Sequence, residues 1–213
     1  MFTGIVEEIG SIAQIKRGGK TLELVINAKI IMSDMKLGDS IAVNGVCLTV
    51  THYNKNSFSV DVMPVTFNAT NLAKLSNGSA VNLERAMAAN GRFGGHVVSG
   101  HIDGVGEIIA CNRLENAIVY KISLAPELAN LCVAKGSIAL DGTSLTLVEV
   151  GEDYLSVALI PHTQKMSLLG CKQIGDSVNI ECDILVKQMQ KMYAKSENNS
   201  KITSGFLLEH GFL

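Results

Sequence analysis

The sequence lacks the features that mark several large classes of proteins. No apolar stretch approaches the ~18 residues that a membrane-spanning helix needs, although the mean hydropathy is positive. Residues 1–8 lack the basic start and apolar core of a secretory signal. The 18 basic residues are balanced by 20 acidic ones and form no basic block. We therefore expect a cytoplasmic protein that binds neither membranes nor nucleic acid.

Several catalytic and metal-binding motifs are also missing. The five cysteines include no Cys-x-x-Cys pair, so we expect free thiols in a reducing compartment and no zinc site. No Gly-x-Ser-x-Gly elbow supports a hydrolase. No Gly-x-Gly-x-x-Gly follows a predicted strand, which argues against a nicotinamide-dependent reductase.

What the chain does contain is an internal repeat. Within the stretch Lys135–Val150 the chain repeats Gly38–Val50 at an offset of 97 residues, and the match continues until Val178–Glu181 repeats Val81–Glu84. The polar, glycine-rich residues 86–95 lie outside both copies and read as a linker. The repeat therefore predicts two domains, at residues 1–86 and 97–183, followed by a C-terminal segment at 184–213.

Each copy is predicted to form six short strands. In the first copy we expect them at residues 1–12, 21–26, 40–43, 46–52, 57–63 and 80–85. In the second copy the first strand is expected at 100–110, where the offset is 96. Asn44-Gly45 and Asp141-Gly142 are two-residue hairpin signals. The fold class is therefore all-β, with two small antiparallel barrels, because closing a barrel hides the edges of short strands.

The pattern changes to a helix after Asp183. Apolar residues recur there at helical spacing, at Leu185, Met189, Met192 and Tyr193. This apolar stripe must be buried either on the barrels or against other copies of the chain, and the sequence leaves both open. Residues 196–201 are polar, and 203–213 end in an apolar run that suggests a docking helix.

Differences between the copies point to chemistry. The second copy carries polar or ionisable groups at His101, Ser144, Asp183 and Lys135, which we compare with Ile5, Cys47, Ala86 and Leu37 in the first. Only the second copy therefore looks equipped for proton transfer near neutral pH. Structural alternatives stay open, because an Asp before a helix is commonly an N-cap and a lysine is commonly solvated.

Two further patterns bear on these candidates. Cys47 and Thr49, like Ser144 and Thr146, share one face of a strand and point either into the barrel or toward its mouth. The alternative is that small residues simply fill a tapering barrel interior. His96 lies five residues before His101, on a different face, so we expect no shared metal and interpret His96 as structural.

The chain resembles the riboflavin synthase family along essentially its whole length. The resemblance is carried by five segments, Met1–Val6, Asn44–Val50, Gly95–His101, Asp141–Thr146 and Ile160–Thr163. It implies two six-stranded Greek-key barrels, a C-terminal helix and a homotrimer formed through that helix. It also implies that two molecules of 6,7-dimethyl-8-ribityllumazine react to give riboflavin and 5-amino-6-ribitylaminouracil, with no cofactor or metal. Lumazine synthase is a further partner suggested by the family.

The same resemblance supplies the site residues. The first barrel is expected to bind one lumazine through Gly4, Ile5, Val6, Cys47, Leu48, Thr49, Asp61, Val62, Met63, Pro64, Val65 and Thr66. The second is expected to use Gly100, His101, Ile102, Lys135, Ser144, Leu145, Thr146, Ala158, Leu159, Ile160, Pro161, His162 and Thr163. The two barrels of neighbouring chains would face each other.

Roles follow by the same analogy. His101 and Ser144 are assigned positioning and proton transfer, Asp183 assists, and Cys47 is a weak nucleophile or hydrogen-bond donor. A non-catalytic lumazine- or flavin-binding protein on the same scaffold is the alternative.

Overall fold

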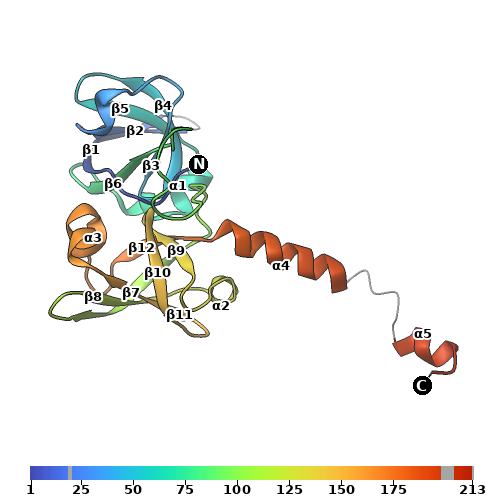
Figure 1. The fold of residues 1–213 in the computed structure, drawn as a ribbon. Coiled ribbons are helices and arrows are strands. Elements are labelled where there is room, and N and C mark those ends of the chain that lie inside the picture. Colours follow the sequence, from blue (N-terminus) through green and yellow to red (C-terminus); the bar gives the residue numbers. More distant parts are fainter. Residues whose placement is uncertain (19–20, 198–203, 213) are drawn as a thin grey trace.

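The computed structural model describes residues 1–18, 21–197 and 204–212, and it contains two closed antiparallel barrels of six strands each (Figure 1). The first barrel consists of β1 (Glu8–Gly18), β2 (Thr21–Asn27), β3 (Ser40–Val43), β4 (Val46–Tyr53), β5 (Ser57–Val62) and β6 (Ala80–Arg85). The second consists of β7 (Gly104–Arg113), β8 (Ile118–Ser123), β9 (Ser137–Leu140), β10 (Thr143–Val150), β11 (Tyr154–Leu159) and β12 (Ser177–Cys182). In each barrel the sixth strand pairs with the third, which is the Greek-key arrangement.

The predicted turns are confirmed. Asn44 and Gly45 both have positive φ, of 46° and 80°, and Asp141 and Gly142 repeat this at 45° and 77°. Two such residues in a row make the tight turn that suits a twisted hairpin. Short helices connect the other strands, at η1 (Ile31–Ser33), α1 (Pro64–Asn68), η2 (Asn71–Lys74), α2 (Pro126–Ala129), α3 (Pro161–Met166) and η3 (Leu168–Cys171).

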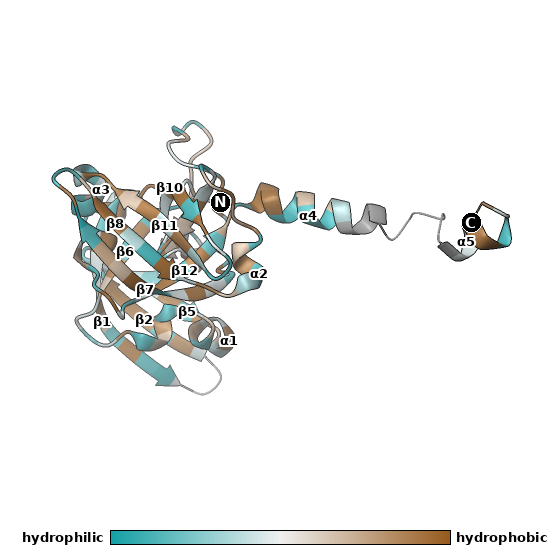
Figure 2. Ribbon diagram, turned by 90° about the horizontal axis from the view of Figure 1, so that it is seen from below, coloured by the Kyte–Doolittle hydropathy of each residue, from teal (hydrophilic) through white to brown (hydrophobic). Residues whose placement is uncertain are grey.

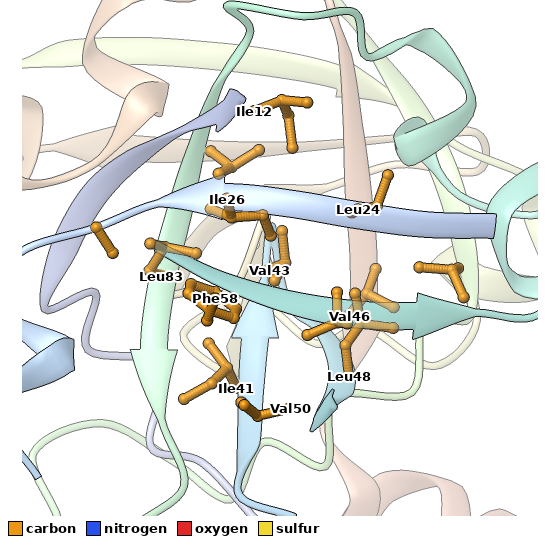
Figure 3. Close-up of a cluster of buried hydrophobic side chains, with 14 of the residues drawn as sticks. Ile12, Leu24, Ile26, Ile41, Val43, Val46, Leu48, Val50, Phe58 and Leu83 are labelled. Atoms are coloured by element: carbon orange, nitrogen blue, oxygen red, sulfur yellow. The ribbon is translucent and has the colours of Figure 1, made fainter. Parts of the chain in front are cut away.

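Each barrel has its own apolar core. Along β2, Leu24 and Ile26 are completely buried while Glu23 points outward, and Figure 2 shows the same alternation of apolar and polar residues along other strands. Figure 3 shows the first core, in which Phe58 and Leu83 meet side chains from β2, β3 and β4. A fully buried Leu, Ile or Phe contributes about 1.5–3 kcal/mol, so each cluster can sustain a separate barrel.

The predicted first strand of each copy begins too early. β1 starts at Glu8 and β7 at Gly104, so residues 1–7 and 97–103 lie outside the barrels' strands. These two leading segments run antiparallel to each other between the barrels instead. The amide of Phe2 donates to the carbonyl of Val98 at 2.7 Å, and the amide of Val98 donates back at 3.1 Å.

A buried polar network joins the barrels at their hairpin tips. The side-chain amide of Asn82 donates to the carbonyl of Asp141, and that of Asn179 donates to the carbonyl of Asn44, both at 2.9 Å. These two bonds are symmetric, but the charge beside them is not. Asp141 is completely buried and forms a 3.0 Å ion pair with Lys172, whereas its counterpart in the first copy is the neutral Asn44.

The C-terminal helix α4 (Ile184–Glu197) extends away from both barrels in Figures 1 and 2. Its apolar stripe is exposed at Leu185, Met189, Met192 and Tyr193. The alternative that this stripe packs on the chain's own barrels is therefore wrong. The last helix, α5 (Ser204–Glu209), follows, while residues 198–203 and 213 of the predicted tail lie outside the described residues. Within the described part of the chain, no helix is long and apolar enough to cross a membrane.

Candidate active site

The leading segments cross over, and each completes the surface of the other copy's barrel. The carbonyl of Gly4 accepts a hydrogen bond from the amide of Ser144 at 2.7 Å. The carbonyl of Gly100 accepts one from the amide of Cys47 at 2.9 Å. The two positions that the repeat singled out, Cys47 and Ser144, are therefore each covered by the leading segment of the opposite copy.

Both crossing glycines are required by space as well as by conformation. Gly4 and Gly100 have φ of 77° and 83°, in the left-handed region. A Cβ added to Gly4 would lie 2.6 Å from the Cβ of Ser144, and one added to Gly100 would lie 2.5 Å from the Cβ of Cys47. Only glycine lets the backbone approach this closely.

Two buried glutamates hold the crossing segments in place. Glu84 accepts from the amide and hydroxyl of Thr3, at 2.7 and 2.8 Å, and from the amide of Gly4 at 3.1 Å. Glu181 accepts in the same way from Ser99, at 2.6 and 2.7 Å, and from Gly100 at 2.9 Å. Burial raises the pKa of Glu84, and the hydrogen bonds from Thr3 and Gly4 oppose that shift.

The glutamates were visible in the sequence as repeated residues, but their task was missed. A carboxylate that recurs at a matched position near the end of each copy is a signal for a shared buried acceptor. The repeat cannot show the rest of the arrangement. Each glutamate binds the leading segment of its own copy, while that segment packs against the barrel of the other copy.

The crossing creates a cavity of about 290 Å³ on the first barrel. Its walls come from β4, from α1 and from the leading segment of the second copy, and it is lined by Val46, Cys47, Val65, Thr66, Ala69, Thr70, Gly100, His101 and Ile102. Six of these residues were predicted from the sequence to belong to binding sites. Cys47 is half-buried and His101 is exposed at the wall.

This cavity corrects the predicted grouping of the site residues. We expected Gly100, His101 and Ile102 to serve the second barrel together with Ser144, yet they line the same cavity as Cys47. His101 therefore belongs to the second copy in sequence but lines a cavity on the first barrel, and its part in proton transfer stays a prediction. The same correction applies to Gly4. It was predicted to share a site with Cys47, but it lies against Ser144 on the second barrel.

Cys47 and Ser144 lie on the outer faces of their barrels. Along β4, Leu48 is buried in the core while Thr49 is exposed on the same face as Cys47. In β10, Leu145 packs against the second core and Thr146 is exposed. The interpretation that these small residues fill a barrel interior is therefore wrong.

His96, which we interpreted as structural from the sequence, lies against Ser144. The Nδ1 atom of His96 is 2.7 Å from the Oγ atom of Ser144. Burial lowers the pKa of His96, while the carboxylates of Asp183 and Glu181 act in the opposite direction. His96 belongs to the segment entering the second copy, and 48 residues separate it from Ser144, so no local pattern could reveal the pair.

Asp183 begins the C-terminal helix. Its Oδ1 atom accepts from the amide of Leu185 at 2.9 Å, and its carbonyl accepts from Val186 and Lys187. The N-cap interpretation is therefore confirmed. Asp183 also lies near enough to His96 to favour the charged imidazole.

Lys135 has a different counterpart from the one expected. Its amide donates to the carbonyl of Leu147, as the amide of Gly38 donates to Val50 in the first copy. Lys135 is therefore matched by Gly38 and not by Leu37. It adopts a φ of 66°, a left-handed conformation that is uncommon for a residue with a side chain.

Most of the remaining predicted residues lie in the last two positions of β5 and β11 and in the segments that follow these strands. Val62 and Leu159 are buried in the two cores. The exposed or partly exposed positions around them are Asp61, Met63, Pro64, Val65 and Thr66 in the first copy and Ala158, Ile160, Pro161, His162 and Thr163 in the second. These segments border the outer faces that carry Cys47 and Ser144. Among the described residues, no three His, Cys, Asp or Glu side chains are placed to hold a metal ion.

Comparison with known proteins gives consistent matches. The family described as the lumazine binding domain matches this chain twice, over residues 3–86 and 99–183. The chain is 51% identical to riboflavin synthase of Bacillus subtilis (strain 168) and 49% identical to that of Actinobacillus pleuropneumoniae, in each case over the whole of both chains. A solved structure of LumP complexed with 6,7-dimethyl-8-(1'-D-ribityl) lumazine superposes with a TM-score of 0.77 at 25% identity, covering 85% of this chain and 99% of that one.

Proposed function

This chain belongs to the lumazine-binding family of riboflavin synthases, and from that premise we propose how its two pockets work. Each molecule of 6,7-dimethyl-8-ribityllumazine binds on the outer face of one barrel. One lumazine transfers a four-carbon unit to the other, which yields riboflavin and 5-amino-6-ribitylaminouracil. The atoms of two substrates equal those of the two products, so the reaction needs no external oxidant.

The observation that carries the proposal is the pair of matching outer faces. Cys47 and Ser144 occupy equivalent positions, and each is covered by a glycine of the opposite leading segment. A reaction between two identical molecules needs two similar binding surfaces that hold them in a fixed orientation. Such orientation can lower a bimolecular barrier by up to roughly 7–11 kcal/mol.

The two pockets have different side chains and so different tasks. In the first pocket, His101 stands beside Cys47 and supplies proton transfer to or from the bound lumazine. In the second, the hydroxyl of Ser144 meets the ring of the other lumazine, and the ammonium of Lys135 lies at its margin. Domains 1–86 and 97–183 are then two lumazine-binding domains.

The assembly follows from the exposed stripe of α4. Leu185, Met189, Met192 and Tyr193 are 55–72% exposed, which is unfavourable for a helix in water. We assign residues 184–213 to trimer formation, so that the first pocket of one chain faces the second pocket of its neighbour. The trimer works in the cytoplasm, with lumazine synthase as a further partner.

The deciding experiment uses the lumazine as sole substrate. The purified chain is mixed with 6,7-dimethyl-8-ribityllumazine, and flavin absorbance is followed together with the diaminouracil product. We expect one riboflavin for every two lumazines consumed, with no added cofactor. Binding without flavin formation would overturn the proposal.

That second outcome corresponds to the alternative function. LumP shares the double barrel and was solved with a bound lumazine. A binding protein of that kind would retain the lumazine unchanged. The product assay therefore separates the two functions in a single measurement.

A further inference from the structure

Two thiols lie close together at the end of the second barrel's last strand. Cys132 follows α2, and Cys182 is the last residue of β12. The Sγ atom of Cys132 lies 3.3 Å from the carbonyl oxygen of Leu128, and the Sγ atom of Cys182 lies 3.9 Å from the same oxygen. The two sulfur atoms therefore share one acceptor, and both thiols are free.

The repeat shows that the pair is not part of the shared scaffold. At the offset of 97 residues, Met35 stands in the first copy where the second has Cys132. Arg85 stands where the second has Cys182. Met35 packs in the first core, and Arg85 binds Glu7. The thiol pair is therefore a feature of the second copy.

The surroundings make the two thiols unequal in reactivity. Cys182 is 1% exposed and belongs to the second core, whereas Cys132 is half-buried at its edge. Hydrogen bonding with Cys182 lowers the pKa of the Cys132 thiol, although burial opposes that shift. The same contact, together with burial, raises the pKa of Cys182. Since the thiolate is the nucleophile in thiol chemistry, Cys132 is the attacking group and Cys182 is the group that resolves the product.

The pair lies where the second barrel joins the C-terminal helix. The amide of Cys182 donates to Oδ2 of Asp103 at 2.8 Å. The same carboxylate oxygen accepts from Nζ of Lys187 in α4, also at 2.8 Å. Cys132 belongs to the connection between α2 and β9. A bond between the thiols would therefore tie this connection to the start of α4.

We propose that Cys132 and Cys182 form a reversible disulfide and that the pair is a modification site for hydrogen peroxide. The Cys132 thiolate attacks a peroxide oxygen, the O–O bond breaks, and the leaving hydroxide takes up the thiol proton to give water. The Cys182 sulfur then attacks the resulting sulfenic acid on Cys132, which forms the S–S bond and releases a second water. The two thiols together lose two electrons, and one hydrogen peroxide is reduced to two waters. A dithiol reverses the bond by exchange.

The first test maps the bond in the full chain and needs neither ligand nor turnover. The protein is treated with hydrogen peroxide, the remaining thiols are alkylated with iodoacetamide in denaturant, and the unreduced chain is digested with trypsin. Cleavage after lysine and arginine puts each of the five cysteines in a separate peptide, with Cys132 in 122–135 and Cys182 in 173–187. We expect these two peptides to be joined, with the loss of two hydrogens, and to separate on treatment with dithiothreitol. Alkylation of both peptides, or joining of Cys132 to any other cysteine, would overturn the proposal.

The second test separates the roles of the two thiols. In Cys182→Ala the sulfenic acid on Cys132 has no thiol to resolve it, so dimedone should label Cys132 about tenfold more than in wild type. In Cys132→Ser the buried Cys182 should stay reduced. Cys171→Ser removes an exposed cysteine and is the matched control, which should form the bond as wild type does. Equal labelling of Cys132 by dimedone in wild type and Cys182→Ala would contradict the assigned roles.

The third test shows whether the bond fits the native fold. A disulfide that closes a loop of about 50 residues constrains the unfolded chain, so the oxidised wild type should melt about 5–10 °C above the reduced protein. The shift should be absent in Cys132→Ser and kept in Cys171→Ser, and circular dichroism checks that each variant folds. A melting temperature that falls when the bond forms would mean that the fold must distort to make it, and the pair would then not be a built site.

Discussion

The outer faces that carry Cys47 and Ser144 occupy equivalent positions in a duplicated fold, yet the polar groups at their centres differ. The first has a thiol at Cys47 beside His101, and the second has a hydroxyl at Ser144 beside His96. The scaffold elements are the same in both, namely a crossing glycine and a buried glutamate. The repeat therefore presents the same backbone surface twice, with different side chains at a few outer positions.

The two copies also differ where the barrels meet, because only the second copy has the Asp141–Lys172 ion pair. The first copy has Asn44 and Leu75 at these positions. We expect Lys172→Leu alone to lower the free energy of unfolding by about 3–5 kcal/mol, because it leaves the completely buried Asp141 without its cation. Urea denaturation at neutral pH measures the change.

The matched control converts the second copy into the first. The double variant Asp141→Asn/Lys172→Leu should recover stability to about the wild-type value, since replacing a buried ion pair by neutral groups is often near neutral. A double variant as unstable as Lys172→Leu would show that Lys172 acts through its other bond, to the Ser177 carbonyl at 2.6 Å.

Substitution of the crossing glycines tests each pocket independently of the other. We expect Gly4→Ala to remove binding at the second pocket and Gly100→Ala to remove it at the first, each at a cost of about 2–5 kcal/mol in stability. The cost combines a left-handed φ, about 1–2 kcal/mol, with an overpacked contact, about 1–3 kcal/mol. Calorimetric titration with lumazine should find one site per chain where wild type has two.

Gly38→Ala is the control for these substitutions. Gly38 has a φ of 87° but nothing within 4 Å of an added Cβ. It should lose only the conformational part, about 1–2 kcal/mol, and keep both sites. Loss of a site in this variant would mean that general destabilisation, and not the crossing, explains the binding results.

The crossing was also the part of the fold that the sequence could not predict. The hairpins at Asn44-Gly45 and Asp141-Gly142 were predicted correctly because a two-residue turn depends on local conformation alone. The barrels followed from the repeat. The barrel on which a leading segment packs, however, is decided by contacts between residues far apart in the sequence. The alternating apolar residues of 1–7 could pack on either barrel.

The same reason explains why the candidate site residues were grouped wrongly. Cys47, His101 and Ser144 were identified from differences between copies, which is local information. Their assignment to pockets depended on the crossing, so His101 was placed with Ser144. His96 was interpreted as structural because its contact with Ser144, 48 residues away, cannot be read from the sequence.

Turnover measures whether the two pockets contribute differently to the reaction. We expect His101→Ala and Ser144→Ala each to lower kcat about a hundredfold, in line with loss of a proton-transfer group or a transition-state donor. Cys47→Ser keeps a small donor and should lose less than about tenfold. If both alanine variants keep wild-type turnover in steady-state kinetics, the assigned roles are wrong.

The smallest expected effect is the pH dependence of stability that the buried His96 produces. The pKa of His96 lies below its ordinary value of 6.5 because burial disfavours the imidazolium, while Asp183 and Glu181 favour it. On acidification the unfolded chain therefore binds the proton before the folded one does. The stability that His96 contributes is complete above pH 6.5 and falls as the pH drops toward the folded-state pKa. The difference in unfolding free energy between wild type and His96→Asn should shrink or reverse from pH 7.5 to pH 5, whereas Ser144→Ala, which keeps the imidazole, should follow the wild-type slope. The outcome that contradicts this is a slope of unfolding free energy against pH that is the same for wild type and His96→Asn. It would mean that His96 binds protons as readily in the folded chain as in the unfolded one. Burial of His96 would then no longer distinguish the second pocket from the first.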